Sequence, residues 1–388
     1  MKIGILTFHK AINYGAFMQA YALSTKLQEV FPNSKVEIID YVAPKEKRKV
    51  YINILWTFKH YGISGGIKEL KKIQSFNSSY KNLSLSFKKN FGSLKELYNY
   101  IEKNYQILII GSDAVFNWNQ NGFPSAFIPD YDFKIPVLTY AASVHGLSYF
   151  DAEQTIIEKC KDTFANMDSV YVRDECTEKF VKFCNSNVNP KHACDPTFLI
   201  DFKKLYKLGH RNKVEIFKKY KINEGNYIVL MLQDEKISRM VYNRYHDNYV
   251  IVSTFMNNPC SDVFLYDLTP IEWCLILKDA SAVVTNYFHG TLLSLEQGVP
   301  TMVIDLSNYT GVYEGKLSDL MKKRLELPDL YFLSDEINNS PSTFFEIFDR
   351  CLEGDFKNQI NVKVLEEAST FADFEKNLKV IINDHYNV

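Results

Sequence analysis

The sequence predicts an α/β protein of two Rossmann-like domains that face each other across a cleft. Short β-branched runs alternate with helical patterns in both halves of the chain, which is the order expected of parallel βαβ units. A polar, lysine-rich stretch at residues 201–224 separates the halves, and 388 residues are enough for two domains. We therefore expect an N-terminal domain at 1–200, a C-terminal domain at 205–335, and helices at 336–388 that pack back on the body.

Each half contains short apolar runs of the kind that form buried parallel strands. In the first half we expect a helix at residues 15–30 and strands at 3–7, 36–41, 106–110, 137–141 and 170–172. In the second half we expect a helix at 270–278 and strands at 227–232, 249–254, 282–285 and 301–304. Ligands of such sheets bind beyond the carboxyl ends of the strands, so the residues that follow each strand are candidates for a site.

Composition argues against several classes of protein. The net charge of −1 argues against a general nucleic-acid binder. The seven cysteines are scattered and include no CxxC pair, so we expect reduced thiols, no structural zinc and a cytoplasmic protein. No apolar run reaches the roughly 18 residues that a transmembrane helix needs. The N-terminal MKIGILTFHK has a strand pattern and lacks the features of a signal peptide.

Positive charge is concentrated at residues 44–90, which we expect to form an insertion in the N-terminal domain. This segment contains eleven lysines and arginines but only two acidic residues, a local net charge of +9. Aromatic and aliphatic residues, among them Trp56 and Tyr61, are interleaved with the cations. This pattern is typical of an interface with anionic lipid or a polyanionic substrate. The alternative is a solvated insertion whose aromatic residues only cover the domain beneath.

The most informative motif is SAVVTNYFHGTLLSLEQGVP at residues 281–300. A buried strand ends at Thr285 and a helical pattern follows at once, so His289 lies at the junction. Backbone N–H groups at such a helix start, here near Gly290 and Thr291, attract anions. An imidazole at this place can hold a phosphate or carboxylate and transfer a proton. The alternative is a histidine that only packs and caps the strand end.

Two strand ends in the first half supply cations. After the first strand, the run HKAINYGA contributes Lys10 with the amide of Asn13 and the phenol of Tyr14, or else forms only a loop. Farther along, Arg173 offers a planar guanidinium to a carboxylate or phosphate, or else pairs with its acidic neighbours. Asp195 fits a structural role at the end of a strand, with a catalytic base as the alternative.

A third strand end in the first half has the composition of a sugar site. Asp113 ends the GSD run and is followed by Asn117 and Trp118. Planar polar groups bind vicinal hydroxyls, and an indole stacks on a pyranose face. Asp113 can instead cap a helix.

Six runs, taken in order, match a known family: ILTFHKAINYGAFMQAYAL, IIGSDAVFNWN, TYAASVHG, YVRDE, CDPTFLI and VVTNYFHGTLLSL. Over residues 3–305 the sequence resembles the polysaccharide pyruvyl transferase family. The resemblance implies a fold similar to that of the B-type glycosyltransferases. It also implies transfer of a pyruvyl group from phosphoenolpyruvate to a pair of sugar hydroxyls, with release of inorganic phosphate. Phosphoenolpyruvate would be a co-substrate, and no other cofactor is expected.

Under this hypothesis the candidate residues take distinct roles. His289 contacts the phosphate and delivers the proton, and Asp113 is the base for the acceptor hydroxyl. The donor would be bound by Arg173, Asn286, Gly290, Thr291 and Lys10. The acceptor would be bound by Asn13, Tyr14, Asn117 and Trp118. No metal is expected.

One position departs from the family pattern. Many members carry an arginine that binds the donor two residues before the histidine, and this sequence has Tyr287 there. Either another cation substitutes, with Lys10 and Arg173 as candidates, or the donor differs.

We therefore expect a transferase of bacterial surface polysaccharide or exopolysaccharide synthesis. Its acceptor would be a sugar or a lipid-linked oligosaccharide, met in the cytoplasm with peripheral contact at the inner face of the membrane through residues 44–90. No nucleic-acid partner is expected. Two alternatives stay open: a nucleotide-sugar-dependent glycosyltransferase of the same fold, and a degenerate sugar-binding subunit without activity.

Overall fold

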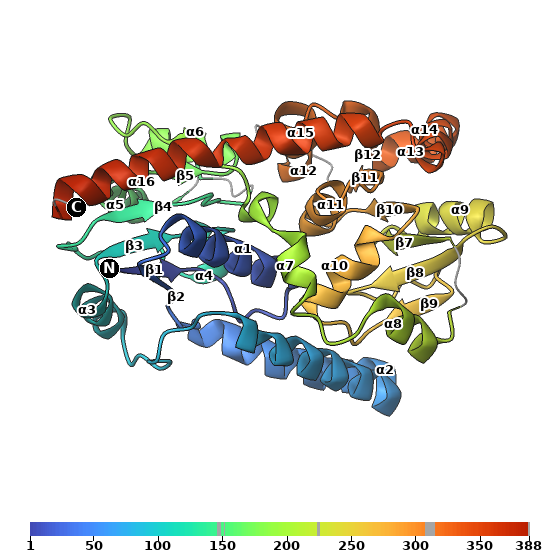
Figure 1. Cartoon of the computed structure of the whole chain (residues 1–388), viewed down its shortest axis with the longest axis horizontal. Coiled ribbons are helices and arrows are strands. Elements are labelled where there is room, and N and C mark those ends of the chain that lie inside the picture. The colour runs from blue at the N-terminus through green and yellow to red at the C-terminus, as the bar shows by residue number, and fades with distance from the viewer. Residues whose placement is uncertain (146–148, 151, 223–225, 307–314, 387–388) are drawn as a thin grey trace. The chain divides into compact units, whose positions relative to one another are not determined.

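The computed structural model (Figure 1) describes residues 1–145, 149–150, 152–222, 226–306 and 315–386, with the backbone alone at 44–47 and 49. The chain divides into two compact units. The first comprises residues 1–50, 81–200 and 368–388, and the second comprises 51–80 and 201–367. This grouping differs from the expected domains in two places. Part of the basic segment belongs to the second unit, and only the last of the C-terminal helices belongs to the first.

The first unit is a parallel sheet with helices, as the alternating pattern predicts. Its strands are β1 (Lys2–Leu6), β2 (Lys35–Ile38), β3 (Ile107–Ile110), β4 (Val137–Thr139), β5 (Tyr171–Val172) and β6 (Lys191–His192). Its helices are α1 (Tyr14–Val30), α3 (Leu94–Asn104), α4 (Trp118–Asn121), α5 (Gln154–Ala165), α6 (Glu175–Cys184), η2 (Pro196–Leu199) and α16 (Phe371–Tyr386).

The strands of the first unit run in the order β2-β1-β3-β4 and all pair in parallel. A bridge between Ala142 and Val172 joins the short β5–β6 pair to the end of β4. Strand β3 is fully buried along its length, which is why its sequence is a continuous apolar run instead of an alternating one.

The second unit is a six-stranded parallel sheet with helices. Its strands are β7 (Tyr227–Met231), β8 (Val250–Thr254), β9 (Val263–Leu265), β10 (Ala282–Thr285), β11 (Thr301–Asp305) and β12 (Tyr331–Leu333). Its helices are α7 (Phe202–Tyr206), α8 (Lys213–Tyr220), α9 (Glu235–Tyr245), α10 (Pro270–Lys278), α11 (Phe288–Leu295), α12 (Lys316–Ser318), η3 (Asp319–Arg324), η4 (Pro328–Leu330), α13 (Ser334–Asn339) and α14 (Pro341–Glu353), with α15 (Lys357–Ser369) running to the unit boundary.

Both sheets contain a topological switch point, which fixes where a ligand can approach. In the first unit the chain leaves β1 for β2 on one side and returns to β3 on the other. In the second unit, whose order is β12-β11-β10-β7-β8-β9, it leaves β7 for β8 on one side and returns to β10 on the other. Side chains that follow β1 and β3, or β7 and β10, therefore flank the crevice in which open parallel sheets bind ligands. The expected α/β class with two parallel sheets is confirmed.

The basic segment forms α2 (Pro44–Ser78), followed by η1 (Ser79–Asn82). Helix α2 is interrupted at Gly62, whose φ of 64° and ψ of −167° fall outside the helical range and suit glycine. A Cβ on Gly66 would lie 2.2 Å from the ring of Phe58, although eight residues of straight helix would place these positions about 12 Å apart. The two halves of α2 are thus folded back on each other, side by side in Figure 1. We call this element the α2 hairpin.

None of the helices within the described ranges is both long and apolar enough to cross a membrane. All seven cysteines are free thiols, and six of them are buried.

Candidate functional site

In the first unit, Arg173 lies at the end of β5 in a buried ion pair. Its Nη1 donates to Asp195 Oδ2 at 3.0 Å and lies 3.7 Å from Asp113 Oδ1. The side chains of Arg173 and Asp195 are 4% and 2% exposed. Burial lowers the pKa of Arg173, but the carboxylates of Asp195, Asp113 and Asp174 outweigh this effect and raise the pKa above its usual value. Arg173 is therefore a permanent cation committed to carboxylates of its own unit.

Asp195 is held by donors from three directions. Besides Arg173, it accepts from Gln19 Nε2 at 2.6 Å and from the backbone and hydroxyl of Thr197 at 3.1 and 2.8 Å. It also caps η2. These contacts give Asp195 a structural role, joining α1 to the end of the sheet.

Asp113 lies after β3 at the switch point of the first sheet. Its backbone has a φ of 76°, a left-handed conformation that is uncommon for any residue but glycine. Gly111, two residues earlier, also has a positive φ, and a Cβ there would lie 2.2 Å from the carbonyl oxygen of Tyr140. The Asp113 side chain is 18% exposed, in contrast to its buried partner Arg173. The geometry thus presents one carboxylate at this edge with a buried guanidinium behind it.

Lys10 and His9 share a single carboxylate, that of Asp40. Lys10 Nζ donates to Asp40 at 2.7 Å, and the buried His9 ring places Nε2 2.9 Å from Asp40 Oδ1. Burial raises the pKa of Asp40, but the hydrogen bonds from His9 and Lys10 outweigh it and hold the pKa below the usual value. This ion pair does not favour the expected donor contact of Lys10, which stays a prediction.

The four expected acceptor residues have structural roles in the first unit. Asn13 caps α1, with its side chain accepting from Gly15 and Ala16. Tyr14 is 1% exposed. Asn117 caps α4 and donates to the carbonyl of Val144. Trp118 is buried against Phe180, with ring centroids 5.4 Å apart. Acceptor binding by these residues remains untested, and the burial of Tyr14 and Trp118 does not favour it.

In the second unit, β10 leads directly into α11, as the 281–300 motif predicts. Tyr287 is the N-cap of α11 and makes no side-chain hydrogen bond to the helix. His289 is half-buried in the first turn. Gly290 is buried, and a Cβ there would lie 2.8 Å from the methyl carbon of Met231 on β7. Glycine therefore lets the helix start close to the ends of β7 and β10.

Thr291 differs from expectation. Its backbone N–H and hydroxyl both donate to the carbonyl of Tyr287, at 2.9 and 3.1 Å, so they are used inside α11. The first N–H groups of a helix have no intrahelical partner, so in α11 the positive end of the helix dipole lies at residues 288–290.

Side chains after β7, β8 and β10 meet in a polar and aromatic cluster. Gln233 Nε2 donates to the Tyr287 hydroxyl at 3.1 Å, and Asn286 Nδ2 donates to Gln233 Oε1 at 3.4 Å. The Phe255 ring packs edge-on against the Tyr287 ring, with the ring centroids 5.5 Å apart. Burial raises the pKa of Tyr287 against a smaller lowering effect of the Gln233 hydrogen bond, so the phenol stays protonated at neutral pH. We call Gln233, Phe255, Asn286, Tyr287 and His289 the switch-point cluster.

Two features of this cluster suit a ligand. Asn286 Oδ1 is buried, and no atom of the described residues forms a hydrogen bond with it. Buried polar atoms are nearly always satisfied, so this one has capacity for a bound molecule. Phe255 has a φ of 65°, a left-handed conformation that costs on the order of 1–3 kcal/mol and is concentrated at functional sites.

The α2 hairpin brings a cation to the same cluster. Lys72 Nζ lies 5.0 Å from the centroid of the Phe255 ring, and its side chain is 14% exposed. Its acidic neighbour Glu69 is 3.7 Å away, which is a loose pair. Nearby on the hairpin, Lys68 lies 5.7 Å from the ring of Tyr266. Lys72 could not be identified as a site residue from sequence, because no local pattern connects it to residues so distant along the chain.

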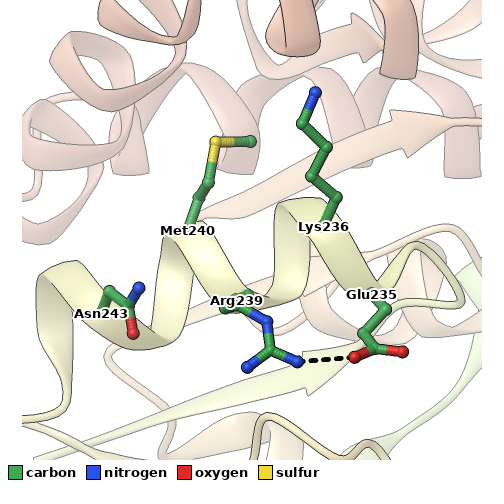
Figure 2. A pocket seen from close by; sticks show the side chains of 5 residues that line it. All are labelled: Glu235, Lys236, Arg239, Met240 and Asn243. Atoms are coloured by element: carbon green, nitrogen blue, oxygen red, sulfur yellow. Dashed lines mark hydrogen bonds and ion pairs between the residues drawn. The ribbon is translucent and has the colours of Figure 1, made fainter.

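No group of three or more His, Cys, Asp or Glu side chains that could hold a metal ion occurs in the described part of the chain. A shallow cavity of about 430 Å³ lies along α9. Figure 2 shows that its lining comes from this one helix, with Glu235 and Arg239 forming an exposed ion pair at 2.6 Å. Because no second element contributes polar groups, the cavity lacks the convergent chemistry of a site.

Comparison with known proteins identifies the family. The sequence matches the family described as polysaccharide pyruvyl transferase over residues 13–308, which is more than half of the chain. The chain belongs to this family. The match includes Asp113, Arg173 and the switch-point cluster, whereas Lys10 precedes it. No curated protein sequence matches the chain.

Solved structures support the fold. A UDP-GlcNAc 2-epimerase from Neisseria meningitidis, bound to UDP-GlcNAc, is similar with a TM-score of 0.57 and 10% identity, covering 98% of this chain and 100% of that one. Another UDP-N-acetylglucosamine 2-epimerase is similar with a TM-score of 0.55 and 10% identity, covering 100% and 96% of the two chains. At this identity the likeness concerns the fold alone. This member of the family has the two parallel α/β sheets of the B-type glycosyltransferase fold.

Proposed function

We propose that the protein transfers a pyruvyl group from phosphoenolpyruvate to two hydroxyls of a sugar, forming a cyclic ketal and inorganic phosphate. The switch-point cluster of the second unit carries this proposal. It combines a helix start, a half-buried imidazole, an unsatisfied amide and a nearby ammonium at the place where an open parallel sheet binds its ligand. Family membership supports it independently.

The donor carries a carboxylate and a phosphate, so its site needs positive potential and hydrogen-bond donors. The backbone at residues 288–290 offers the positive end of α11, and Lys72 offers an ammonium group. Lys72 thus takes the part of the arginine that many family members carry where this chain has Tyr287. Asn286 completes the set, since its amide can turn to present either oxygen or nitrogen.

The reaction needs one acid and one base. His289 donates a proton to the methylene carbon of phosphoenolpyruvate, which makes C2 electrophilic. A sugar hydroxyl attacks C2 and loses its proton to the base. The C2–O bond to phosphate then breaks, phosphate leaves with its electron pair and a proton, and the second hydroxyl closes the ring. One proton enters the methyl group and two leave the hydroxyls, one to restore the acid and one with phosphate, so the protons balance.

Asp113 is the proposed base for the acceptor hydroxyl. Its carboxylate is partly exposed at the switch point of the first sheet, and the buried Arg173 behind it fixes its position. We therefore assign Arg173 a positioning role in place of the donor contact expected from the sequence. The acceptor is proposed to be a sugar of a bacterial surface polysaccharide or exopolysaccharide, carried on a lipid and met at the inner face of the membrane.

Phosphate release from phosphoenolpyruvate tests the proposal. The full chain is incubated with the donor and a panel of nitrophenyl and lipid-linked sugars, and both phosphate and the mass of the sugar product are measured. We expect acceptor-dependent phosphate release with formation of the ketal. His289→Ala should reduce it by about 100-fold or more, as expected for loss of a general acid, while substitution of the exposed C-cap residue of α9, His246→Ala, should leave it unchanged.

Two outcomes would contradict the proposal. If a panel of nucleotide sugars yields glycosyl transfer while phosphoenolpyruvate is untouched, the protein is a glycosyltransferase of the same fold. If His289→Ala keeps normal turnover at saturating donor, His289 is structural and the proton must come from elsewhere.

A further inference from the structure

The α2 hairpin exposes an unusual concentration of large apolar side chains. Eighteen large hydrophobic side chains are exposed among the described residues, and eight of them fall between positions 51 and 70. Their exposed fractions range from 45% to 76%. They are Tyr51, Ile52, Leu55 and Trp56 on the first half, Tyr61 at the tip, and Ile63, Ile67 and Leu70 on the second half.

These side chains form continuous stripes because of their spacing. Ile52, Leu55 and Trp56 lie three or four residues apart, as do Ile63, Ile67 and Leu70 after the turn. Residues at that spacing share one face of a helix.

A different face of the hairpin does the internal packing. Phe58 packs against Gly66 between the two halves, Phe76 is fully buried, and Lys68 lies over Tyr266 of the same unit. A hairpin that only covered the domain beneath it would bury its apolar face and expose its polar face. In the α2 hairpin the side chains of the inner face are packed, yet a second apolar surface remains open to solvent.

Positive charge flanks the exposed stripes. Arg48, Lys59 and Lys71 are exposed, while Glu69 is the one acidic residue between positions 48 and 72. An aromatic and aliphatic surface bordered by cations is complementary to an anionic lipid surface, where the apolar groups enter the acyl boundary and the cations meet the headgroups. A protein partner or a second copy of this chain would not by itself require that charge.

We propose that the α2 hairpin docks the protein on anionic membranes, with Trp56, Tyr61 and Ile63 entering the interface near the tip. This inference rests on exposure and charge alone and does not depend on the donor chemistry. It goes beyond the proposed function in assigning the membrane contact to one face of one element. Because Lys72 of the same hairpin lies at the switch-point cluster, the element that meets the lipid is also part of the proposed donor site.

Fluorescence of the full chain provides a direct test. The protein has three tryptophans, and only Trp56 is exposed, because Trp118 and Trp273 are 7% and 3% exposed. Vesicles of phosphatidylcholine with phosphatidylglycerol should therefore shift the emission to shorter wavelength, and brominated lipid should quench it. Vesicles of phosphatidylcholine alone should have a much smaller effect. Trp56→Phe should abolish both signals while the protein still co-sediments with the anionic vesicles.

Matched variants separate the apolar and the electrostatic contributions. Leu55→Gln combined with Ile63→Gln should reduce co-sedimentation by at least tenfold. Lys59→Gln combined with Lys71→Gln should reduce it by roughly 25-fold at low salt, about fivefold per charge, and by less at high salt. The control is Val362→Gln combined with Leu365→Gln, two exposed apolar residues on α15 that should not matter. Since all these side chains are exposed, circular dichroism should show unchanged folding.

Three results would overturn the proposal. If the parent protein fails to bind anionic vesicles, the hairpin has no membrane role. Equal loss in the α15 control would show that binding is not specific to the hairpin. A dimer in sedimentation velocity that Leu55→Gln and Ile63→Gln convert to a monomer, without any vesicle binding, would assign the surface to a second copy. Phosphate release with a soluble acceptor should be unchanged in the variants at positions 55, 56, 59, 63 and 71, so failure of the membrane proposal is distinct from failure of the proposed transferase activity.

Discussion

Replacing Arg173 with methionine tests whether the buried ion pair of the first unit organises its candidate base. Methionine retains most of the side-chain volume but removes the charge. Asp195 would keep its hydrogen bonds from Gln19 and Thr197 but lose its counter-ion, and Asp113 would lose the guanidinium behind it. Removing one partner of a buried pair costs about 3–5 kcal/mol, because the remaining charge is left uncompensated.

The assay is urea unfolding followed by circular dichroism, which reports the midpoint of the transition. For a domain of this size the free energy of unfolding falls by about 2–3 kcal/mol per molar urea, so a loss of about 4 kcal/mol moves the midpoint down by roughly 1.3–2 M. The matched control is Arg239→Met on α9. Its pair with Glu235 is shorter, at 2.6 Å, but both side chains are 62% exposed. Such a pair contributes about 0.3–0.5 kcal/mol, and the midpoint should barely move.

A double variant sharpens the result. Arg173→Met combined with Asp195→Asn removes the buried negative charge as well, so it should recover part of the lost stability. If the midpoint of Arg173→Met lies within about 0.2 M urea of the parent's, the buried pair contributes no more to stability than an exposed pair. The assignment of Arg173 as a positioning residue would then be wrong, and the donor contact expected from the sequence would regain support.

Further predictions concern the donor site, the base and the pH dependence. Lys72→Met should weaken phosphoenolpyruvate binding, measured by calorimetry, by about 10- to 100-fold, the value of one charged hydrogen bond, whereas the exposed Lys71→Met should leave it unchanged. Equal affinities of the two variants for phosphoenolpyruvate would show that Lys72 is not part of the donor site. Asp113→Asn should lower turnover by roughly 100-fold or more with little change in donor affinity, and a parallel loss of donor affinity would contradict its role as acceptor base. Because the folded-state pKa of Asp40 is lowered, its contribution to stability is present above its unfolded pKa near 4 and is lost as the pH falls below that. Asp40→Asn should therefore destabilise the protein at pH 7, with the difference from the parent narrowing towards pH 3; a difference that does not change with pH would show that charge is not its source.

Much of the fold could be predicted because buried parallel strands leave a clear trace in sequence. Central strands such as β3, β7 and β10 are continuous apolar runs, since helices cover both faces of the sheet. The strands that were missed are three residues or fewer, as in β9 and β12, and too short to show a period. The helical C-terminus was expected, but which helix joins which unit was not, because that depends on contacts between distant segments.

The candidate site could be predicted only in part from the sequence, for a related reason. Strand ends are visible in sequence, and the α11 start with its histidine lies where the 281–300 motif placed it. The direction of each side chain is not visible. Sequence suggested that Arg173 and Lys10 reach the donor, but both are paired with carboxylates of their own unit. Tyr14 and Trp118 were expected to meet a sugar, but they are buried in the core.

The sequence by itself determined the α/β class, the family, the strand ends that carry polar groups, and the basic and aromatic character of residues 44–90. These properties are local, since they depend on periodicity, composition and motifs within short windows. Only the tertiary structure decided that this segment folds into a hairpin at Gly62, that it leaves one apolar face exposed, and that Lys72 lies over Phe255. The physical reason is that the burial and pairing of a charge depend on neighbours brought together by chain folding, and those neighbours leave no local signal in the sequence.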